Sequence, residues 1–259
     1  MLKLISTYFR LGALNELQYR ANFWINLLQS ALSLLTGLAG MGVVFYHTDA
    51  LAGWQPMELL ALLGIYFLMS GFISTFVQPS MERFLTDIRQ GTFDFVLTKP
   101  RDSQLLMSIR RISIWSLMDV LLGVGVLLAA LVRLGRGLSI PQVLAFLLVL
   151  AAGAVIVYSF WLMLATIAFW FVKVENILVV FQSMYQAGRW PVSIYPAALR
   201  VLLTFLVPVA FAVTVPAEAI VGRLTWTTLA AALGLAVAIF AAARAFWRYG
   251  VRSYSGASA

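Results

Sequence analysis

The sequence predicts an all-α integral membrane protein with six transmembrane helices, a long polar loop after the second, and a broken or re-entrant segment before the last. Of its 259 residues, 62% are hydrophobic and 11% are charged. A soluble domain carries roughly 45–50% apolar and about 25% charged residues. The apolar residues are also gathered into runs of about 20, the length that a helix needs to cross a bilayer core. Residues 1–259 are therefore expected to form a single transmembrane domain.

The first 22 residues are expected to lie along the cytoplasmic interface of the membrane. Three basic residues are spread through them, and the uncharged run 21–48 that follows is far longer than the ~7–15 residues of a signal-peptide core. Phe23 and Trp24 then mark entry into the bilayer. An ordinary helical extension of the first span fits the same pattern, so both interpretations stay open.

Five apolar runs are long enough to cross as straight helices, and all but one, which contains Asp119, are uncharged. They are 23–46, 59–77, 112–132, 142–172 and 224–243. The run 142–172 has 31 residues without a charge, so it must tilt or project beyond the membrane.

The region 189–217 is expected to be broken or re-entrant. Arg189 and Arg200 divide it, and its uncharged pieces are short for a straight crossing. Proline also interrupts a helix, because it lacks an N–H and clashes with the preceding turn. The prolines of this region are Pro191, Pro196, Pro208 and Pro216.

Only one net crossing fits between 176 and 217 if the two termini share a side, and two arrangements provide it. In the first, 176–192 crosses outward and 197–217 is a re-entrant hairpin on the outer face. In the second, 176–190 lies along the cytoplasmic interface and 200–219 is the crossing. Charge counting favours the second arrangement, because it moves Arg189 and Arg200 inside.

The distribution of basic residues sets the orientation. The loop 80–111 holds six Lys and Arg residues, whereas 47–58 holds none. Cytoplasmic loops carry the excess of Lys and Arg in membrane proteins. We therefore expect a multi-pass protein whose two termini and whose 80–111 loop are cytoplasmic.

No enzyme site is recognisable in the sequence. None of the three lysines is followed by Ser or Thr, which excludes a GxxxxGK[ST] phosphate loop on this chain. With no Cys and one His, we expect neither a disulfide nor a metal site. The net charge of +8 is spread between the apolar runs and forms no patch, so nucleic acid is not an expected partner.

Asp119 is the clearest ionisable candidate inside a span, where a charge costs about 2.5–3.5 kcal/mol on insertion scales. It lies eight residues beyond Arg111, about 12 Å along a helix. It could be the coupling carboxylate of a proton- or sodium-driven carrier. We expect instead a structural Asp that pairs with a cytoplasmic-side Arg of a neighbouring helix. Glu218, at a predicted span boundary, is a second candidate.

The loop 80–111 begins with a predicted amphipathic helix, ERFLTDIRQG. Phe84, Leu85 and Ile88 fall on one face of it, with charged residues on the other. Gly91 can end this helix, because glycine readily adopts the left-handed conformation found after a helix C-terminus.

A short turn is expected after Gly91. Thr92 or Asp94 can cap it, and Pro100 can end it. Its apolar edge Phe-Val-Leu, 95–97, with charges on both sides, suits docking into a groove on a soluble partner. The same residues could rest on lipid headgroups in a solvated loop.

Several stretches carry a resemblance over nearly the whole chain. They are DIRQGTFDFVLTKPRDSQ after the second span, the pair Glu175-Asn176, and RWPVSIYPAALR with TFLVPVAFAVTVPAEAIVGR before the last span. In the first of them, residues 91–100 follow the pattern Gly-x-Phe-Asp-x-x-Leu-x-Lys-Pro. In these features the chain resembles the permease subunits of ABC-2-type transporters, in their prokaryotic six-span branch.

The resemblance implies that the loop contains a coupling helix that contacts a separate ATPase subunit. The residues expected to dock are Phe84, Ile88, Gly91, Phe93, Asp94, Phe95, Leu97, Lys99 and Pro100. ATP and Mg²⁺ would be bound by that partner, with no cofactor on this chain. The proline-rich region would form outer re-entrant helices, in favour of the first arrangement.

The expected function is therefore that of an exporter permease in the plasma membrane of a prokaryote. The expected partners are the ATPase, membrane lipid, and a second permease that is either identical or paralogous. An ion-coupled secondary carrier or a membrane scaffold is the alternative. The apolar spans suit lipids, amphiphilic drugs or lipophilic cations as cargo, although the sequence does not select among cargoes.

Overall fold

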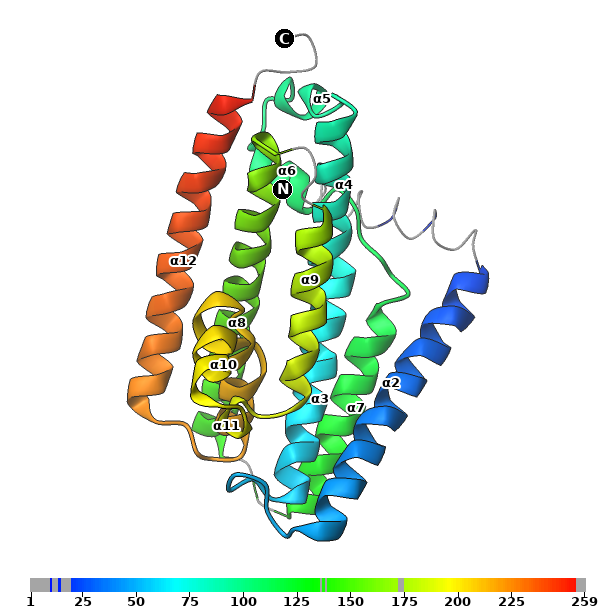
Figure 1. Cartoon of the computed structure of the whole chain (residues 1–259), viewed down its shortest axis with the longest axis vertical. Helices are drawn as coiled ribbons and strands as arrows, with labels where there is room; N and C mark the ends of the chain where they lie inside the picture. The colour runs from blue at the N-terminus through cyan, green and yellow to red at the C-terminus, as the bar shows by residue number, and fades with distance from the viewer. Residues whose placement is uncertain are drawn as a thin grey trace.

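The computed structural model describes residues 20–135, 137, 139–171 and 175–254, together with Arg10 and Leu14. The interfacial segment predicted for 1–22 therefore lies almost entirely outside the described residues. The described chain is a bundle of long helices without a β-strand (Figure 1). The first helix, α2 (Arg20–His47), begins in the same half of the bundle in which the last, α12 (Trp226–Ser253), ends (Figure 1).

The remaining elements run back and forth between two ends of the bundle. After α2 come α3 (Pro56–Phe72), a π-helical turn (Ile73–Val77), α4 (Gln78–Arg89), α5 (Asp94–Leu97) and α6 (Ser103–Ser108). They are followed by α7 (Leu117–Leu134), α8 (Ile140–Thr166), α9 (Glu175–Tyr185), α10 (Ala197–Val201) and α11 (Val215–Ile220). We call the end that holds α4, α5 and α6 the loop end, and the opposite end, near α10 and α11, the hairpin end (Figure 1).

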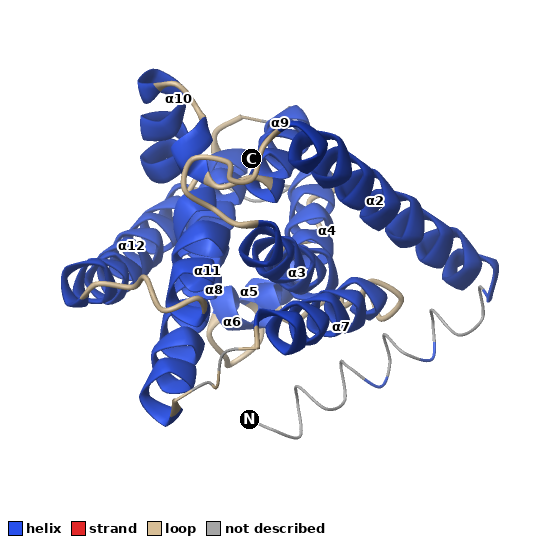
Figure 2. Ribbon diagram, turned by 90° about the horizontal axis from the view of Figure 1, so that it is seen from below, coloured by secondary structure: helices blue, strands red, loops and turns tan. Residues whose placement is uncertain are grey.

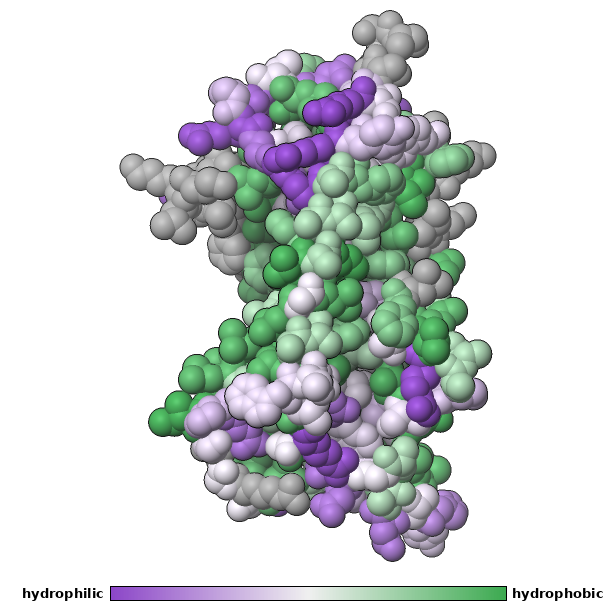
Figure 3. Space-filling model, turned by 90° about the vertical axis from the view of Figure 1, so that its left-hand side faces the viewer, coloured by the Kyte–Doolittle hydropathy of each residue, from purple (hydrophilic) through white to green (hydrophobic). Residues whose placement is uncertain are grey.

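In the part of the chain that the structure describes, five helices are long and apolar enough to cross a membrane, or six if the bent pair Ala197–Phe205 and Ala210–Ile220 is one span, and the five agree with the five predicted runs. The five are Ala21–His47, Pro56–Arg89, Leu117–Leu134, Ile140–Phe169 and Trp226–Ser253. Figure 3 shows an apolar band across the middle of one face, with hydrophilic residues gathered toward both ends. The chain is a multi-pass membrane protein.

The broken region forms a hairpin that enters the bundle and returns. Its arms, Ala197–Phe205 and Ala210–Ile220, meet at an angle of 75°. A Cβ atom added at Gly153, midway along α8, would lie 2.5 Å from the carbonyl oxygen of Phe211. At the first turn of α8, the Gln142 side chain donates to the carbonyl of Ile220 over 2.8 Å. The second arm thus covers only half of α8.

The first of the two predicted arrangements accounts for this geometry. In Figure 1, α9 runs along the bundle from the loop end toward the hairpin end, and does not lie across the end of the bundle. Three of the four prolines occupy the breaks, where a missing N–H interrupts no helix, whereas Pro216 lies within the second arm. Pro191 and Pro196 precede short helical turns, Pro208 lies in the bend between the arms, and Pro216 lies in the first turn of α11.

The centre of the bundle is α3, with α2 at the periphery (Figure 2). The backbones of α3 and α7 are in direct contact. A Cβ atom at Gly64 would lie 2.6 Å from the amide nitrogen of Leu127, and one at Gly123 would lie 2.3 Å from that of Leu68. Small residues that allow such approach are a common basis of helix association in lipid, where no hydrophobic effect drives it.

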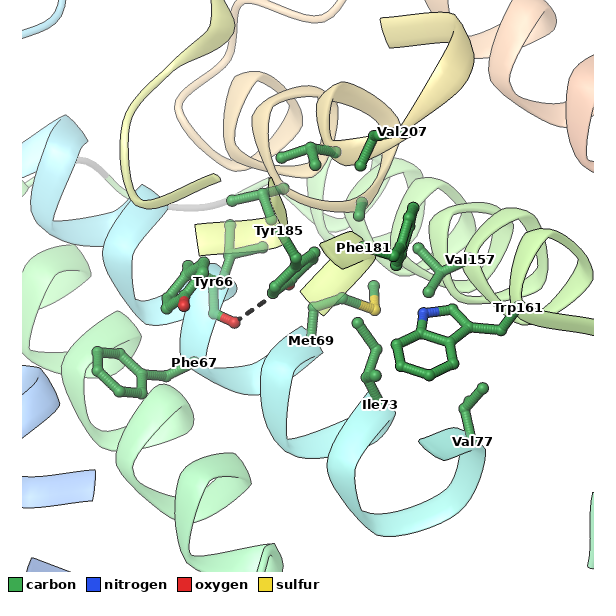
Figure 4. Packing of buried hydrophobic residues seen from close by; sticks show 14 of the residues in the cluster. Tyr66, Phe67, Met69, Ile73, Val77, Val157, Trp161, Phe181, Tyr185 and Val207 are labelled. Atoms are coloured by element: carbon green, nitrogen blue, oxygen red, sulfur yellow. Dashed lines mark hydrogen bonds between the residues drawn. The ribbon is translucent and has the colours of Figure 1, made fainter. Parts of the chain in front are cut away.

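Aromatic side chains connect α3 to α8 and α9. Tyr185 of α9 stacks on Tyr66 of α3 at 5.3 Å between ring centroids, and its hydroxyl donates to the Tyr66 carbonyl over 3.4 Å (Figure 4). Phe181 packs against Trp161 of α8, with centroids 5.5 Å apart. These contacts hold one face of α9 against the core.

An ion pair between a buried carboxylate and an exposed guanidinium closes the hairpin end. Arg223 donates to the carboxylate of Glu58 and, over 2.8 Å, to the carbonyl of Gly53. Its guanidinium also lies 5.2 Å from the ring centroid of Trp54. Because Glu58 belongs to α3 and Arg223 precedes α12, this pair fixes the two connections at that end to each other.

We predict that Gly123→Ala destabilises the bundle, because the new methyl group would collide with the backbone of α3. Overpacking of this kind costs about 1–3 kcal/mol. Thermal unfolding of the purified protein in detergent measures the effect. The matched control is Gly125→Ala on the same helix, where an added Cβ has nothing within 4 Å. Equal melting temperatures for the two variants would contradict the close α3–α7 contact.

Candidate functional site

The loop end rests on a cluster of five aromatic rings. The α4 residue Phe84 is 1% exposed and Phe93 is fully buried. Their rings contact three others at centroid distances of 5.1–6.0 Å. The cluster consists of Phe84, Phe93, Phe169, Trp247 and Tyr254. Phe84 and Phe93, which the sequence assigns to docking, therefore support the loop from inside and face no partner.

The turn after α4 differs from the prediction in its caps. Gly91 has a φ of +66°, so it adopts the left-handed conformation expected of it. The Thr92 hydroxyl, however, donates to the carboxylate of Asp87 over 3.0 Å and caps no helix. Asp94 is the first residue of α5, whose N-terminus has no side-chain cap. The predicted cap is wrong because α5 begins one residue after Phe93, whose side chain at the N-cap position has no oxygen to accept a backbone N–H.

Asp87 ties the start of the loop to its end, and the sequence analysis missed this role. Its side chain is 1% exposed, yet it pairs with Arg83 at 3.2 Å and with the guanidinium of Arg110. A buried carboxylate is tolerated when such partners satisfy its oxygens. The one sequence signal was Arg83 four residues earlier on the same helical face.

The exposed part of the loop is small. Phe95 is 70% exposed and Leu97 is 38% exposed, whereas Val96 between them is buried. Lys99 and Pro100 are exposed as well, and Ile88 packs partly buried against the core. We call Phe95, Leu97, Lys99 and Pro100 the loop tip. Of the predicted docking residues, these four present the most accessible surface.

A second ionic link joins the loop to α12. Asp102 caps α6 by accepting from the Leu105 amide over 3.1 Å, and it also accepts two hydrogen bonds from Arg244. These bonds from Arg244 hold the pKa of the Asp102 carboxyl below its ordinary value, although burial raises it. The stabilisation is therefore present above about pH 3.9 and is lost as the pH falls through the lowered pKa. At neutral pH the link is intact.

The loop is also connected to α8 by a chain of hydrogen bonds. Arg244 donates to Gln104 over 2.7 Å, and Gln104 donates to the hydroxyl of Tyr158 over 3.1 Å. Near the loop, the pKa of Tyr254 is raised by burial and, secondarily, by the charge of Asp94. Three helices, α4, α8 and α12, thus hold the loop in place.

A polar cleft of about 500 Å³ lies between α2, α3, α7 and α9. Most side chains on its walls carry hydroxyl, amide or charged groups. They include Asn26, Gln29, Ser30, Ser33, Ser70, Ser74, Gln78, Glu82, Arg111, Ser113, Ser116, Asp119, Gln182, Gln186 and Arg189. Polar groups within spans are rare and face an interior or a water-filled cavity, so this concentration marks a functional candidate.

Asp119 faces this cleft from α7. The hydroxyl of Ser30 on α2 donates a hydrogen bond to it, and no ion pair of Asp119 occurs in the described part of the chain. The predicted pairing with a cytoplasmic-side Arg is therefore wrong. Arg110 is bound to Asp87 instead, and Arg111 is exposed at the edge of the cleft.

Arg189 faces the cleft from the opposite side. It follows α9 and donates to the hydroxyl of Ser33 over 2.7 Å, and its guanidinium lies 5.4 Å from the ring centroid of Tyr66. Its Nε atom is buried without a hydrogen-bond partner. In the sequence Arg189 served only as a charge that divides the region 189–217, and nothing there indicated a position inside the bundle.

The cleft is open at the loop end and along its side. Its exposed residues Glu82 and Arg111 lie at the loop end, and Gln29, Gln182 and Gln186 are exposed along its length. Beyond Arg189, Trp190 packs on α2, where a Cβ atom at Gly40 would be 3.5 Å from its ring. Glu218 does not join the cleft. It is partly buried on α11 and lines a separate open groove of about 420 Å³ with Arg200.

Neither the cleft nor the loop offers a metal site. Among the residues that the structure describes, no three His, Cys, Asp or Glu side chains are grouped so that they could hold a metal ion.

The chain matches the profile of the ABC-2 family transporter proteins over residues 31–258. No curated protein and no solved structure matches it. The match includes α3 to α12, and with them the loop, the hairpin and most of the polar cleft. The chain belongs to the ABC-2 family of membrane transport proteins.

Proposed function

We propose that the chain is the permease subunit of an ATP-driven exporter, powered by a separate ATPase subunit that docks at the loop tip. The loop tip carries the proposal. It presents two exposed apolar side chains, Phe95 and Leu97, on a turn that is fixed from below by buried rings and ion pairs. An apolar anchor held by a rigid base is what a groove on a partner can bind without a large ordering cost.

ATP and Mg²⁺ are expected to be bound by the partner, because this chain lacks a phosphate-binding lysine motif. A force applied at the tip would reach three spans. The ring cluster joins α4 to α8 and α12, and Asp102 adds a second link to α12. Movement of the ATPase could thus be transmitted to the walls of the cleft.

The export direction is supported by the position of the cleft. It opens at the end that holds the six basic residues of 80–111, the end that the positive-inside rule places in the cytoplasm. A solute could enter from that side while Trp190 and the hairpin cover the other. On this proposal both termini are cytoplasmic and the membrane is the plasma membrane of a prokaryote.

A second permease, identical or paralogous, is proposed to lie against α2. Large apolar side chains of this helix are exposed, among them Trp24, Leu28 and Leu35. Lipid would cover such a surface, but α2 is also a wall of the cleft, so a second subunit there would complete the enclosure. An ion-coupled carrier is less well supported, because Asp119 is the one acidic residue deep in the cleft.

The orientation is tested by single cysteines, since the natural chain has none. Lys99→Cys at the loop tip should react with a membrane-impermeant maleimide only in inside-out vesicles. Asp49→Cys, exposed at the hairpin end, should react in intact cells. The reverse pattern would overturn both the orientation and the export direction.

Docking is tested by the double variant Phe95→Asp/Leu97→Asp. Burying unpaired carboxylates in an apolar groove costs several kcal/mol, so ATPase affinity should fall about a hundredfold or more. The readout is co-purification, in mild detergent, of a subunit that carries a GxxxxGK[ST] motif.

Two controls accompany this variant. Phe95→Leu/Leu97→Met keeps the tip apolar and should retain the ATPase. Tyr46→Asp makes the same kind of change at an exposed aromatic residue of the hairpin end and should retain it too. Undiminished co-purification with the Asp double variant would refute docking at the tip.

A further inference from the structure

The polar cleft contains two opposite charges, Arg189 and Asp119, and neither forms an ion pair with a side chain in the described residues. Each is held by one serine of α2. A charge within a span is costly and is normally neutralised by a partner. The guanidinium of Arg189 donates to Ser33 through one of its nitrogens, and its Nε is buried without a partner among the described residues.

The two charges lie at different depths. Ser30 and Ser33, which contact Asp119 and Arg189, are three residues apart on α2, a rise of about 4.5 Å. On α3, Tyr66 lies beside Arg189, whereas Gly71 packs against the backbone of Asp119. Five residues of helix are a rise of about 7.5 Å. The charges are therefore separated by about 5–8 Å along the bundle, with Arg189 deeper.

The wall between the two charges is built for hydrogen bonding. Ser70 of α3 lies between the levels of the two charges, Ser74 of the π-helical turn lies just beyond Asp119, and Gln186 belongs to the same turn as Arg189. The charges at the mouth, Glu82 and Arg111, are again one of each sign, so the lining has no net charge. An apolar cargo would leave these groups unpaired, which disfavours its binding.

We propose that this cleft binds a small zwitterionic solute, whose anionic group pairs with Arg189 and whose ammonium group pairs with Asp119. The charges of the solute must be several bonds apart, as in a dipeptide, whose two residues span at most about 7 Å. A volume of about 500 Å³ is ample for such a molecule. The proposal rests on the proposed transport function and replaces the lipophilic cargo that the apolar spans alone suggest.

The charge map of the cleft is tested first, on the purified chain in nanodiscs without any ATPase. Ser33→Cys reports on the Arg189 end, and Ser116→Cys reports on the Asp119 end. The probes are anionic sulfonatoethyl and cationic trimethylammonioethyl methanethiosulfonate. Opposite charges at this separation should favour the anionic reagent at position 33 and the cationic one at position 116, each about three- to tenfold.

Matched variants assign the preference to the named charges. Arg189→Gln should abolish the anionic preference at position 33, whereas Arg200→Gln, whose Arg lies outside the cleft, should leave it. Asp119→Asn should abolish the cationic preference at position 116. If Arg189→Gln fails to fold, Arg189→Lys keeps the charge and must keep the preference. No reaction at either position, or no charge preference, would overturn the proposal.

The solute class is tested by protection of Ser33→Cys from modification. Alanyl-alanine should slow the reaction at least about tenfold more than N-acetyl-alanyl-alanine or alanyl-alaninamide, because each capped form loses one ion pair. Equal protection by all three, protection by none, or stronger protection by tetraphenylphosphonium would refute a zwitterion site. ATPase docking is not needed for any of these readouts, so their failure is distinct from failure of the docking variants.

Discussion

The direct backbone contact between α3 and α7 is the constraint on which the rest of the structure depends. Gly64 and Gly123 allow it, and Gly71 extends it to the level of Asp119 on α7. Without this contact Asp119 would have no fixed position relative to α2, and the cleft would lose one wall. The same helix continues through the π-helical turn into α4, so the element that sets the cleft also carries the loop.

The loop end and the cleft are directly connected through the backbone. The π-helical turn 73–77 joins them, and the carbonyl of Thr75 within it accepts a hydrogen bond from Ser113, in the connection that precedes α7. π-helical turns are frequent at functional sites, where they alter the direction of a helix. Rotation at this turn would move Ser74 in the cleft relative to Gln78 at its mouth. That is a physical route from the proposed docking surface to the proposed binding site.

The sequence predicted the spans well, because about 20 uncharged residues have no other stable environment than lipid. It also predicted the breaks at the prolines and the glycine that ends α4. The prediction from the sequence failed where contacts between residues far apart in the chain determine the position of a side chain. The sequence could not show that Phe84 and Phe93 meet Trp247, or that Asp119 meets Ser30, since both depend on helices far apart in the chain. The position of Arg189 stayed open for the same reason, because it depends on the packing of α9 against α2 and α3.

Contact between the loop tip and an ATPase subunit is tested most directly by photo-crosslinking in native membranes. A benzophenone amino acid in place of Phe95 should yield a crosslinked product that contains a subunit with a GxxxxGK[ST] motif. The same group in place of Tyr46, which is even more exposed and lies at the hairpin end, should yield none. Crosslinking of that subunit from position 46 and not from position 95 would contradict the account, because it would put the ATPase on the opposite side of the membrane from the loop.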